Sequence, residues 1–292
     1  MSISRRNGPI IRNSFPLDGF STAAKRRMAD WLAAYTEAEQ QLGNTASLVN
    51  FGDEVNAGLV SAATFTGMKF NASGLSPVWT PSTALSTWTA PLDLSVPNNW
   101  VGRAPKLTFN GTSDRMTTPD ATYWTRALAA FSVGAWVYLT DATSSAVMAK
   151  YTTTGNLREW QFWFDASDKL QLILWDEDDA ATPNATLDTE ANAAISEGVW
   201  HHVVATYDGS ANASGIDIYI DGAVVASTDT DDVNFVSMRN YTAVVELGTG
   251  NGGNFFDGST LGGPYGPFFV QAQLTAAQVY NRYARQRLAI GV

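Results

Sequence analysis

The chain has 292 residues, a formal net charge of −10 and no cysteine, which excludes disulfide frameworks and thiolate metal sites. Aromatic residues make up 12% of the chain and charged residues only 16%, a composition that favours an all-β fold. No apolar run is long enough to span a bilayer, and the first residues lack the apolar segment of a secretory signal. We therefore expect a protein that does not enter membranes and is not exported by the usual route.

The first 27 residues differ in charge from the rest. They carry a net +5, because Asp18 is their only acid, and the remaining chain therefore carries −15. The basic residues of this segment are Arg5, Arg6, Arg12, Lys25, Arg26 and Arg27. A basic segment on an acidic body can bind an acidic partner, a copy of itself or nucleic acid, or it can be a solvated tail. Nucleic acid is the weakest of these partners, because the acidic body would repel phosphate.

Residues 1–20 are predicted to form an extended arm, and residues 21–43 an amphipathic helix. In the helix, Met28, Trp31 and Tyr35 fall on one apolar stripe. Basic residues lie at the start of this helix and acids at its end, an order that is unfavourable for the helix dipole. These charges are therefore better explained by a binding partner than by helix stability. We therefore take the basic residues together with Met28, Trp31 and Tyr35 as candidates for anchoring a partner. The alternative is that the stripe docks on the body of the same chain.

Residues 44–104 are rich in Ser, Thr, Pro and Trp, and predict a connecting region with short strands. From residue 105 onward the pattern is regular. "FSVGAWVYL" alternates as a strand, "REWQFWFDASDKLQLILW" predicts a hairpin around 166–169, and "GIDIYIDGAVVAS" predicts a hairpin that turns on Asp221-Gly222. Thr275 and Gln278 form a capping box, so a short helix is predicted at the C-terminus.

The order of these segments resembles a known family. "LTFNGTSDRMTTPD", "FSVGAWVYL", "VWHHVVATYDGS", "IYIDGAVVAS" and "GPFFVQAQLTAAQVYNRY" are similar to successive signatures of laminin-G-like domains of the concanavalin A-like superfamily. The resemblance covers residues 105–292 and implies a two-sheet antiparallel β-sandwich, or jelly roll, that serves adhesion, glycan binding or virion and cell-surface structure. The closing "QVYNRYARQRLAIGV" is similar to the ends of such domains in bacteriophage structural proteins.

The sequence offers no catalytic residues. His201 and His202 are neighbours on a predicted strand and point to opposite faces, so they cannot converge on one substrate or metal, and both are expected to be structural. Sandwich glycosidases of the resembling superfamily carry paired acids on one strand. Glu177 and Asp179 are the nearest candidates, but their stretch reads as a loop and no third acid follows. A hydrolase or lyase is therefore the least favoured class, and we expect no enzyme activity.

Two acidic clusters are the candidates for a calcium site, which needs several hard oxygen ligands. The clusters span 176–179 and 229–232, and the candidate ligands in them are Asp176, Asp178, Asp179, Asp229 and Asp231. The alternative is that these acids are solvated, so no cofactor is required. Trp175 and Asp176 are the candidates for facing a glycan, with packing as the alternative for the tryptophan.

"LGTGNGGNFFDG" has the Gly248-x-Gly250-x-x-Gly253 spacing of a dinucleotide fingerprint. No helix follows the last glycine, so no helix N-terminus is available for a pyrophosphate. We predict a structural loop without a phosphate, anchored by Phe255 or Phe256.

These observations favour a non-enzymatic virion protein, a bacteriophage decoration or appendage subunit assembled in the bacterial cytoplasm. Its N-terminal region would attach to other virion proteins and to copies of itself, and the sandwich would face outward. The alternative is a glycan-binding lectin or adhesin, which is compatible with a place on the virion.

Overall fold

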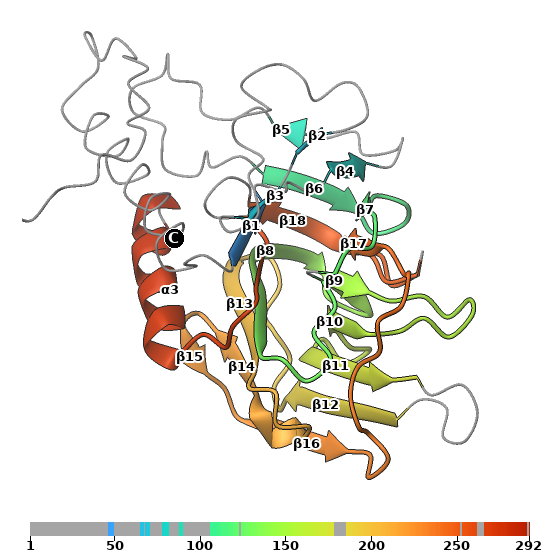
Figure 1. The fold of residues 1–292 in the computed structure, drawn as a ribbon. Coiled ribbons are helices and arrows are strands. Elements are labelled where there is room, and N and C mark those ends of the chain that lie inside the picture. The colour runs from blue at the N-terminus through green and yellow to red at the C-terminus, as the bar shows by residue number, and fades with distance from the viewer. Residues whose placement is uncertain are drawn as a thin grey trace, which may run out of the picture.

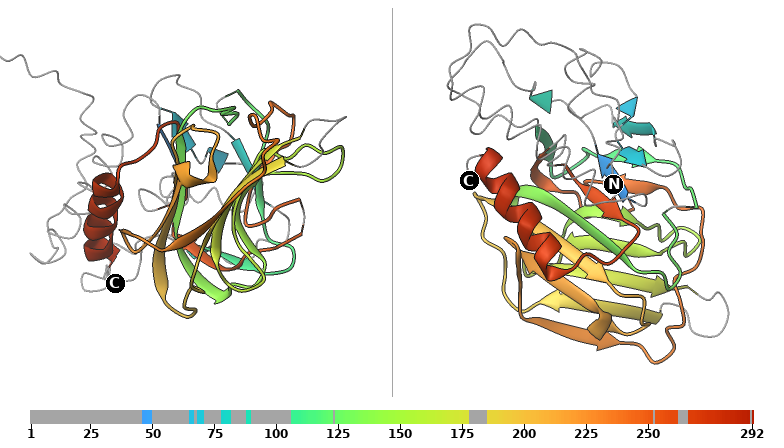
Figure 2. Two further views of the ribbon diagram at one scale, coloured as in Figure 1. Left: turned by 90° about the horizontal axis from the view of Figure 1, so that it is seen from below. Right: turned by 60° about the vertical axis from the view of Figure 1, so that its left-hand side comes forward.

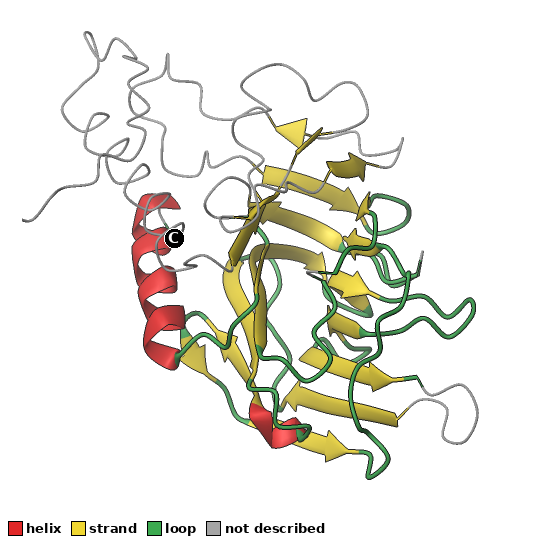
Figure 3. Ribbon diagram, in the orientation of Figure 1, coloured by secondary structure: helices red, strands yellow, loops and turns green. Residues whose placement is uncertain are grey.

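The computed structural model describes residues 46–49, 65–66, 68–70, 78–81, 88–89, 106–122, 124–177, 185–251, 253–261, 266–290 and 292. These residues form a two-sheet antiparallel β-sandwich with one α-helix near the C-terminus (Figure 1, Figure 3), which confirms the predicted fold class. The predicted arm, residues 1–20, and the predicted helix, residues 21–43, lie outside the described residues.

The first sheet is organised around its longest strand, β8. This strand pairs with β13 on one side and with both β18 and β19 on the other. The strands of this sheet are β1 (Ala46–Val49), β3 (Met68–Phe70), β5 (Trp88–Thr89), β6 (Lys106–Asn110), β8 (Phe131–Asp141), β13 (Trp200–Tyr207), β14 (Ile216–Ile220), β15 (Ala223–Val224), β18 (Asp257–Leu261) and β19 (Phe268–Val270).

The second sheet runs in the order β16-β12-β11-β10-β9-β17-β7-β4-β2. Its strands are β2 (Phe65–Thr66), β4 (Val78–Pro81), β7 (Met116–Thr118), β9 (Ser145–Lys150), β10 (Trp160–Phe164), β11 (Leu170–Asp176), β12 (Ala185–Ala191), β16 (Ser227–Asp231) and β17 (Val245–Leu247). Strand β12 shows the period of two most clearly, because its buried and half-buried residues alternate along its whole length.

Aromatic side chains from both sheets fill the core. The Phe269 ring stacks on the rings of Phe131 and Trp160 at centroid distances of 5.2 Å, and it meets Trp124 edge-on at 5.4 Å. All four side chains are fully buried. The alternation read from the sequence therefore directs these rings into one contiguous core between the sheets.

Both predicted hairpins form. Strands β10 and β11 pair in register around the 165–169 turn. Strands β14 and β15 join through Asp221 and Gly222, whose φ angles of +52° and +79° suit a tight two-residue turn. The Asn110-Gly111 turn has another role, since β6 belongs to the first sheet and β7 to the second, and the turn carries the chain from one sheet to the other.

Strands that precede residue 105 also belong to the sandwich. Strand β1 pairs with β19 and β3, β4 pairs with β7, and β5 pairs with β6. The two sheets therefore include segments from upstream of the region whose sequence resembles laminin-G-like domains.

The C-terminal helix α3 (Ala276–Ile290) lies along the outside of the first sheet (Figure 2). Its predicted capping box is present, because the Thr275 backbone N–H donates to Gln278 Oε1 at 2.8 Å and the Gln278 N–H donates back to Thr275 Oγ1 at 3.3 Å. Within the described ranges, the other helical segment is the 3-10 turn η3 (Ala213–Gly215). Among the described residues, no helix has the length and apolar character needed to cross a membrane.

Candidate functional site

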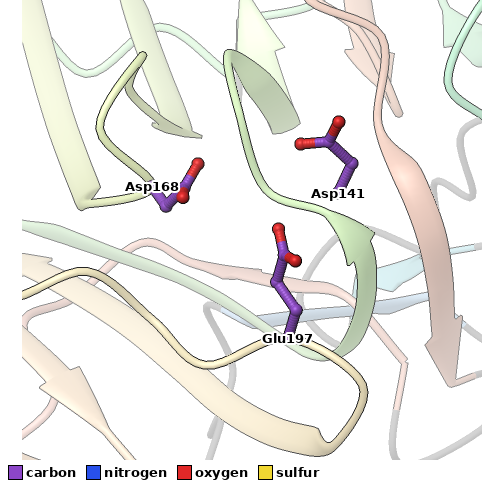
Figure 4. A group of neighbouring side chains, drawn as sticks. All are labelled: Asp141, Asp168 and Glu197. Atoms are coloured by element: carbon purple, nitrogen blue, oxygen red, sulfur yellow. The ribbon is translucent and has the colours of Figure 1, made fainter.

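Three carboxylates converge at one rim of the sandwich (Figure 4). Asp141 ends β8, Asp168 lies in the turn between β10 and β11, and Glu197 lies in the connection between β12 and β13. One carboxylate oxygen of each residue lies within 4.8 Å of the others. These residues are far apart in the sequence, so only the folding of the two sheets brings them together. We call this group the rim acid trio.

Local hydrogen bonds orient the rim acid trio. The Thr143 backbone N–H donates to Asp141 Oδ1, and the Thr143 hydroxyl donates to Asp168 Oδ1, both at 2.9 Å. The Ala142 N–H donates to Glu197 Oε1 at 2.8 Å. The short β8–β9 connection thus links all three acids, and its three donor groups offset part of the repulsion between the carboxylates.

The trio makes this rim strongly acidic. Asp257 is paired with Asp141 between β18 and β8. Burial raises the pKa of Asp257, and the charges of Asp141 and Glu197 raise it further. Three convergent carboxylates offer up to six hard oxygens, the ligand type that Ca²⁺ prefers. The rim acid trio is accordingly the group in the described part of the chain that could hold such a cation.

The described members of the predicted calcium set, Asp176, Asp229 and Asp231, do not form such a group. Asp176 is buried: its Oδ1 accepts the Arg239 Nε–H at 2.8 Å, and its Oδ2 accepts the backbone N–H groups of Val236 and Ser237 at 2.8 and 3.0 Å. It fastens the long connection between β16 and β17 to the sheet. Its carboxylate is therefore a structural anchor.

The other predicted ligands have separate positions. Asp229 and Asp231 lie on β16, where Asp229 Oδ1 accepts the Thr189 hydroxyl at 3.0 Å and Asp231 Oδ1 accepts the Ala213 N–H at 2.5 Å. Asp178 and Asp179 lie outside the described residues, so the five-residue set as a whole stays a prediction.

The prediction that Trp175 and Asp176 face a glycan is corrected. Only 6% of Trp175 and 2% of Asp176 are exposed, and the Trp175 ring packs against Tyr151 at a centroid distance of 5.0 Å. The reason is that both residues belong to β11, and the β16–β17 connection is tied over the end of that strand through Asp176. Trp175 is a packing residue, the alternative left open by the sequence.

Glu177 is likewise engaged in structure. It is buried and forms an ion pair with Arg158, and burial raises its pKa while the Arg158 charge opposes that shift. Asp179, its partner in the weakly favoured hydrolase dyad, lies outside the described residues. The residues proposed to anchor a partner lie outside them too: Arg5, Arg6, Arg12, Lys25, Arg26, Arg27, Met28, Trp31 and Tyr35.

The two histidines lie on opposite faces of β13, as the strand pattern predicted. His202 is fully buried under α3, with its ring centroid 5.2 Å from that of Trp136. Burial lowers the pKa of His202 well below its usual value, and the nearby Arg282 charge acts in the same direction. His201 shares its face with the core residue Val203 but lies at the beginning of the strand, where its side chain remains 13% exposed.

The sequence reasoning missed a pair of carboxylates on β12. Asp188 and Glu190 alternate with buried residues and so share the outer face of the second sheet. The Gln171 amide donates to both Asp188 oxygens at 2.7 and 2.6 Å, and Lys169 pairs with Glu190 at 2.6 Å. Burial raises the pKa of Asp188 to about 6. The Asp-x-Glu spacing in an alternating segment was the signal that could have identified the pair.

The glycine-rich segment is a structural loop, as predicted. Gly248 has a φ of +85° and packs so closely on Phe109 that a Cβ there would overlap the ring. Gly250 and Gly253 exchange backbone hydrogen bonds across a tight turn. Of the two predicted anchors, Phe256 is fully buried and contacts Phe109 edge-on at 5.5 Å, whereas Phe255 is half-buried.

Comparison with known proteins identifies the family. A laminin G family model, described as the concanavalin A-like lectin/glucanases superfamily, matches residues 110–260. No curated protein matches the chain.

Several solved structures share the fold at low sequence identity. The binding domain of botulinum neurotoxin serotype D/C is 12% identical with a TM-score of 0.52. The aligned region covers 84% of this chain and 52% of that domain. The binding domain of serotype D is also 12% identical, with a TM-score of 0.51 and coverage of 87% and 53%. The chain thus spans about half the length of these binding domains, and the likeness establishes the fold alone.

Proposed function

The chain belongs to the concanavalin A-like lectin/glucanases superfamily, and on that premise we propose that it is a binding subunit of a virion. In this proposal the sandwich is displayed outward, and residues 1–45 attach it to other virion proteins or to further copies of the chain. The particle would be of the bacteriophage type, because the C-terminal segment resembles domain ends in phage structural proteins.

The observation that carries the proposal is the division of charge along the chain. Residues 1–27 carry a net +5 and the remainder −15. Opposite charges on two parts of one chain suit contacts between neighbouring copies or with an acidic particle surface, since electrostatic complementarity selects partners and register. Asp176 pairs with Arg239 and Glu177 pairs with Arg158. Because these acids make structural contacts, they support a binding role over glycoside hydrolysis.

Deletion of residues 1–27 tests this proposal. We expect the truncated chain to keep a cooperative thermal transition, because the described strands lie downstream, and to lose association with particles in co-sedimentation. A full-length variant with its six N-terminal basic residues replaced by glutamine should lose association as well, whereas Asp18→Asn should retain it. Normal particle association by the truncated chain would refute the proposal.

A second candidate function is glycan binding, and the rim acid trio favours it. A cation held by three carboxylates at an exposed rim can coordinate sugar hydroxyls, which are also hard oxygen ligands. The trio is formed by Asp141, Asp168 and Glu197, of which Asp141 and Glu197 are exposed. This function is compatible with a place on a virion.

A glycan array probed with and without Ca²⁺ tests the second candidate. We expect binding that requires Ca²⁺ and that falls at least about tenfold in Glu197→Gln, which keeps an oxygen for the Ala142 N–H but removes a charge from the site. Asp188→Asn is the matched control, because it removes one acid from β12 and leaves the trio intact. Absence of binding in both conditions would exclude the lectin function.

A further inference from the structure

Ser196, His201 and Asp221 are hydrogen-bonded in series at the surface. The Ser196 hydroxyl oxygen lies 2.7 Å from His201 Nε2, and His201 Nδ1 lies 2.8 Å from Asp221 Oδ2. The Ser196 residue is exposed, and the side chains of His201 and Asp221 are 13% and 34% exposed. Solvent and a large substrate can therefore reach the serine end of the series.

The chemistry of the groups fixes the direction of each hydrogen bond. An ionised carboxylate only accepts, so His201 Nδ1 carries the proton and donates it to Asp221. In the neutral imidazole Nε2 is then the acceptor, and the Ser196 hydroxyl must donate to it. A serine whose proton is held by an imidazole, which is oriented in turn by a carboxylate, has the arrangement that activates a nucleophile.

The fold holds the series in place. Val203 on β13 pairs with Ile220 on β14, so the turn that follows Ile220 lies beside the beginning of β13. In this turn Asp221 Oδ1 also accepts the His202 backbone N–H at 2.9 Å, and the Asp221 N–H donates to the His202 carbonyl at 2.8 Å. Both oxygens of Asp221 are thus engaged, and the carboxylate that orients His201 is itself fixed to the strand.

We propose that Ser196 is a catalytic nucleophile that hydrolyses unhindered acyl esters, with His201 as its general base and Asp221 as the residue that positions His201. An exposed site on a sandwich rim suits a short acyl group carried on the surface of a larger molecule. This activity goes beyond the binding function proposed above, and it does not depend on a virion partner or on calcium.

The reaction balances without a further reagent. The Ser196 oxygen forms a bond to the ester carbonyl carbon while His201 Nε2 takes the hydroxyl proton. The ester C–O bond then breaks, and His201 returns the proton to the departing alkoxide. Water attacks the acyl-serine, its proton again passing through His201, and the carboxylic acid is released with Ser196 restored.

Hydrolysis of p-nitrophenyl acetate by the full chain tests the proposal. Imidazoles react slowly with this ester, so Ser196→Ala provides the baseline. We expect nitrophenolate release by the natural chain at least about tenfold above that baseline, since general-base assistance contributes about a hundredfold or more. Intact-mass analysis after rapid quenching should show one added acetyl group, and peptide analysis should place it on Ser196.

Three further variants make the outcome decisive. His201→Gln should fall to the Ser196→Ala baseline. Asp221→Asn should keep the turn, because asparagine adopts positive φ readily, yet lose at least about tenfold in release through the wrong imidazole tautomer. Ser210→Ala removes an exposed turn serine elsewhere and should leave release unchanged. The proposal is overturned if the natural chain and Ser196→Ala release nitrophenolate at the same rate, whatever the change in their thermal stability.

Discussion

At the scale of single residues, identical side chains in this sandwich have different roles because their surroundings differ. Asp176 is buried and satisfied by Arg239 and two backbone donors, whereas Asp141 lies exposed within the rim acid trio. Lys150 is fully buried, yet it contacts Glu159, Asp120 and the Tyr241 carbonyl. Burial raises the pKa of Glu159, and the Lys150 charge opposes this. Paired buried charges thus serve structure, while exposed convergent ones remain available to ligands.

The effect of burial on a carboxylate can be tested at Asp188 by measuring stability as a function of pH. Its pKa is raised to about 6 in the folded chain, mainly by burial, from a usual value of 3.8. Between about pH 4 and pH 6 the folded chain therefore binds this proton more tightly than the unfolded chain does, so the free energy of unfolding falls as pH rises through that window. Asp188→Asn removes the ionisation and should be more stable than the natural chain at pH 7–8 by about 1 kcal/mol, since partial exposure screens the effect.

Urea unfolding of Asp188→Asn and the natural chain from pH 4.5 to 8 measures this difference. The advantage of the variant should shrink towards the acidic end. Asp229→Asn on the neighbouring strand serves as the control and should show no such trend. A stability difference that is constant with pH would contradict the assignment of the shifted group to Asp188.

At the scale of elements, α3 is joined to the first sheet by specific polar and aromatic contacts. The Trp136 Nε1–H donates to Gln286 Oε1 at 2.8 Å, and the Arg282 guanidinium lies 4.1 Å from the centre of the Phe268 ring. The Tyr283 ring stacks on Trp136 at a centroid distance of 5.8 Å. The helix therefore depends on residues from β8 and β19, and its position should be sensitive to the turn of the β14–β15 hairpin that adjoins it.

Gly222 in that turn provides the test. A Cβ at Gly222 would lie 2.8 Å from Tyr283 Cδ1, and the φ of +79° is unfavourable for alanine. Gly222→Ala should therefore destabilise the fold by about 1–3 kcal/mol. Gly198→Ala is a matched control, because Gly198 has a similar φ of +73° with no other atom within 4 Å of a Cβ, so it carries the strain without the clash.

Thermal unfolding of the two alanine variants separates clash from strain. Gly222→Ala should lower the Tm more than Gly198→Ala does, and near-ultraviolet circular dichroism should report a changed environment for Trp136. Equal losses in both variants would show that the contact between α3 and the hairpin contributes nothing to stability.

At the scale of the whole molecule, the sandwich is larger than the segment that matches the family. The family model covers residues 110–260, but β1, β4 and β5 from upstream cover edges of β19, β7 and β6. Strands without partners on an edge leave backbone donors and acceptors unpaired and invite association. The upstream strands therefore complete both sheets.

Two fragments should differ for this reason. Residues 44–292 retain the upstream strands, whereas residues 105–292 lose all of them. We expect the Tm of the shorter fragment to be lower by at least about 5 °C, since each kcal/mol corresponds to about 2–4 °C in a chain of this size. Light scattering should also detect more association in the shorter fragment. Equal Tm values for the two fragments would show that the strands before residue 105 are dispensable.

The local features of this protein follow from neighbouring residues in the sequence. Alternation, the Asp221-Gly222 turn, the capping box at Thr275 and the glycine-rich loop with its Phe256 anchor all depend on neighbouring residues, and each forms as predicted. The order of strand signatures also predicted the sandwich, because each segment in the order contains at least one of its strands.

Where chemistry can occur depends on the tertiary structure. It brought Asp141 at the end of β8 together with Asp168 and Glu197 from two separate connections. It also aligned Ser196 with His201 and Asp221, although the sequence predicted only structural roles for the histidines. It also buried Trp175 and Asp176, which the sequence proposed for ligands. Strand pairing sets the distances between residues that are remote in the sequence. The burial of a side chain depends on which connection covers the end of its strand. Local sequence patterns contain neither kind of information, because both depend on residues far apart in the chain.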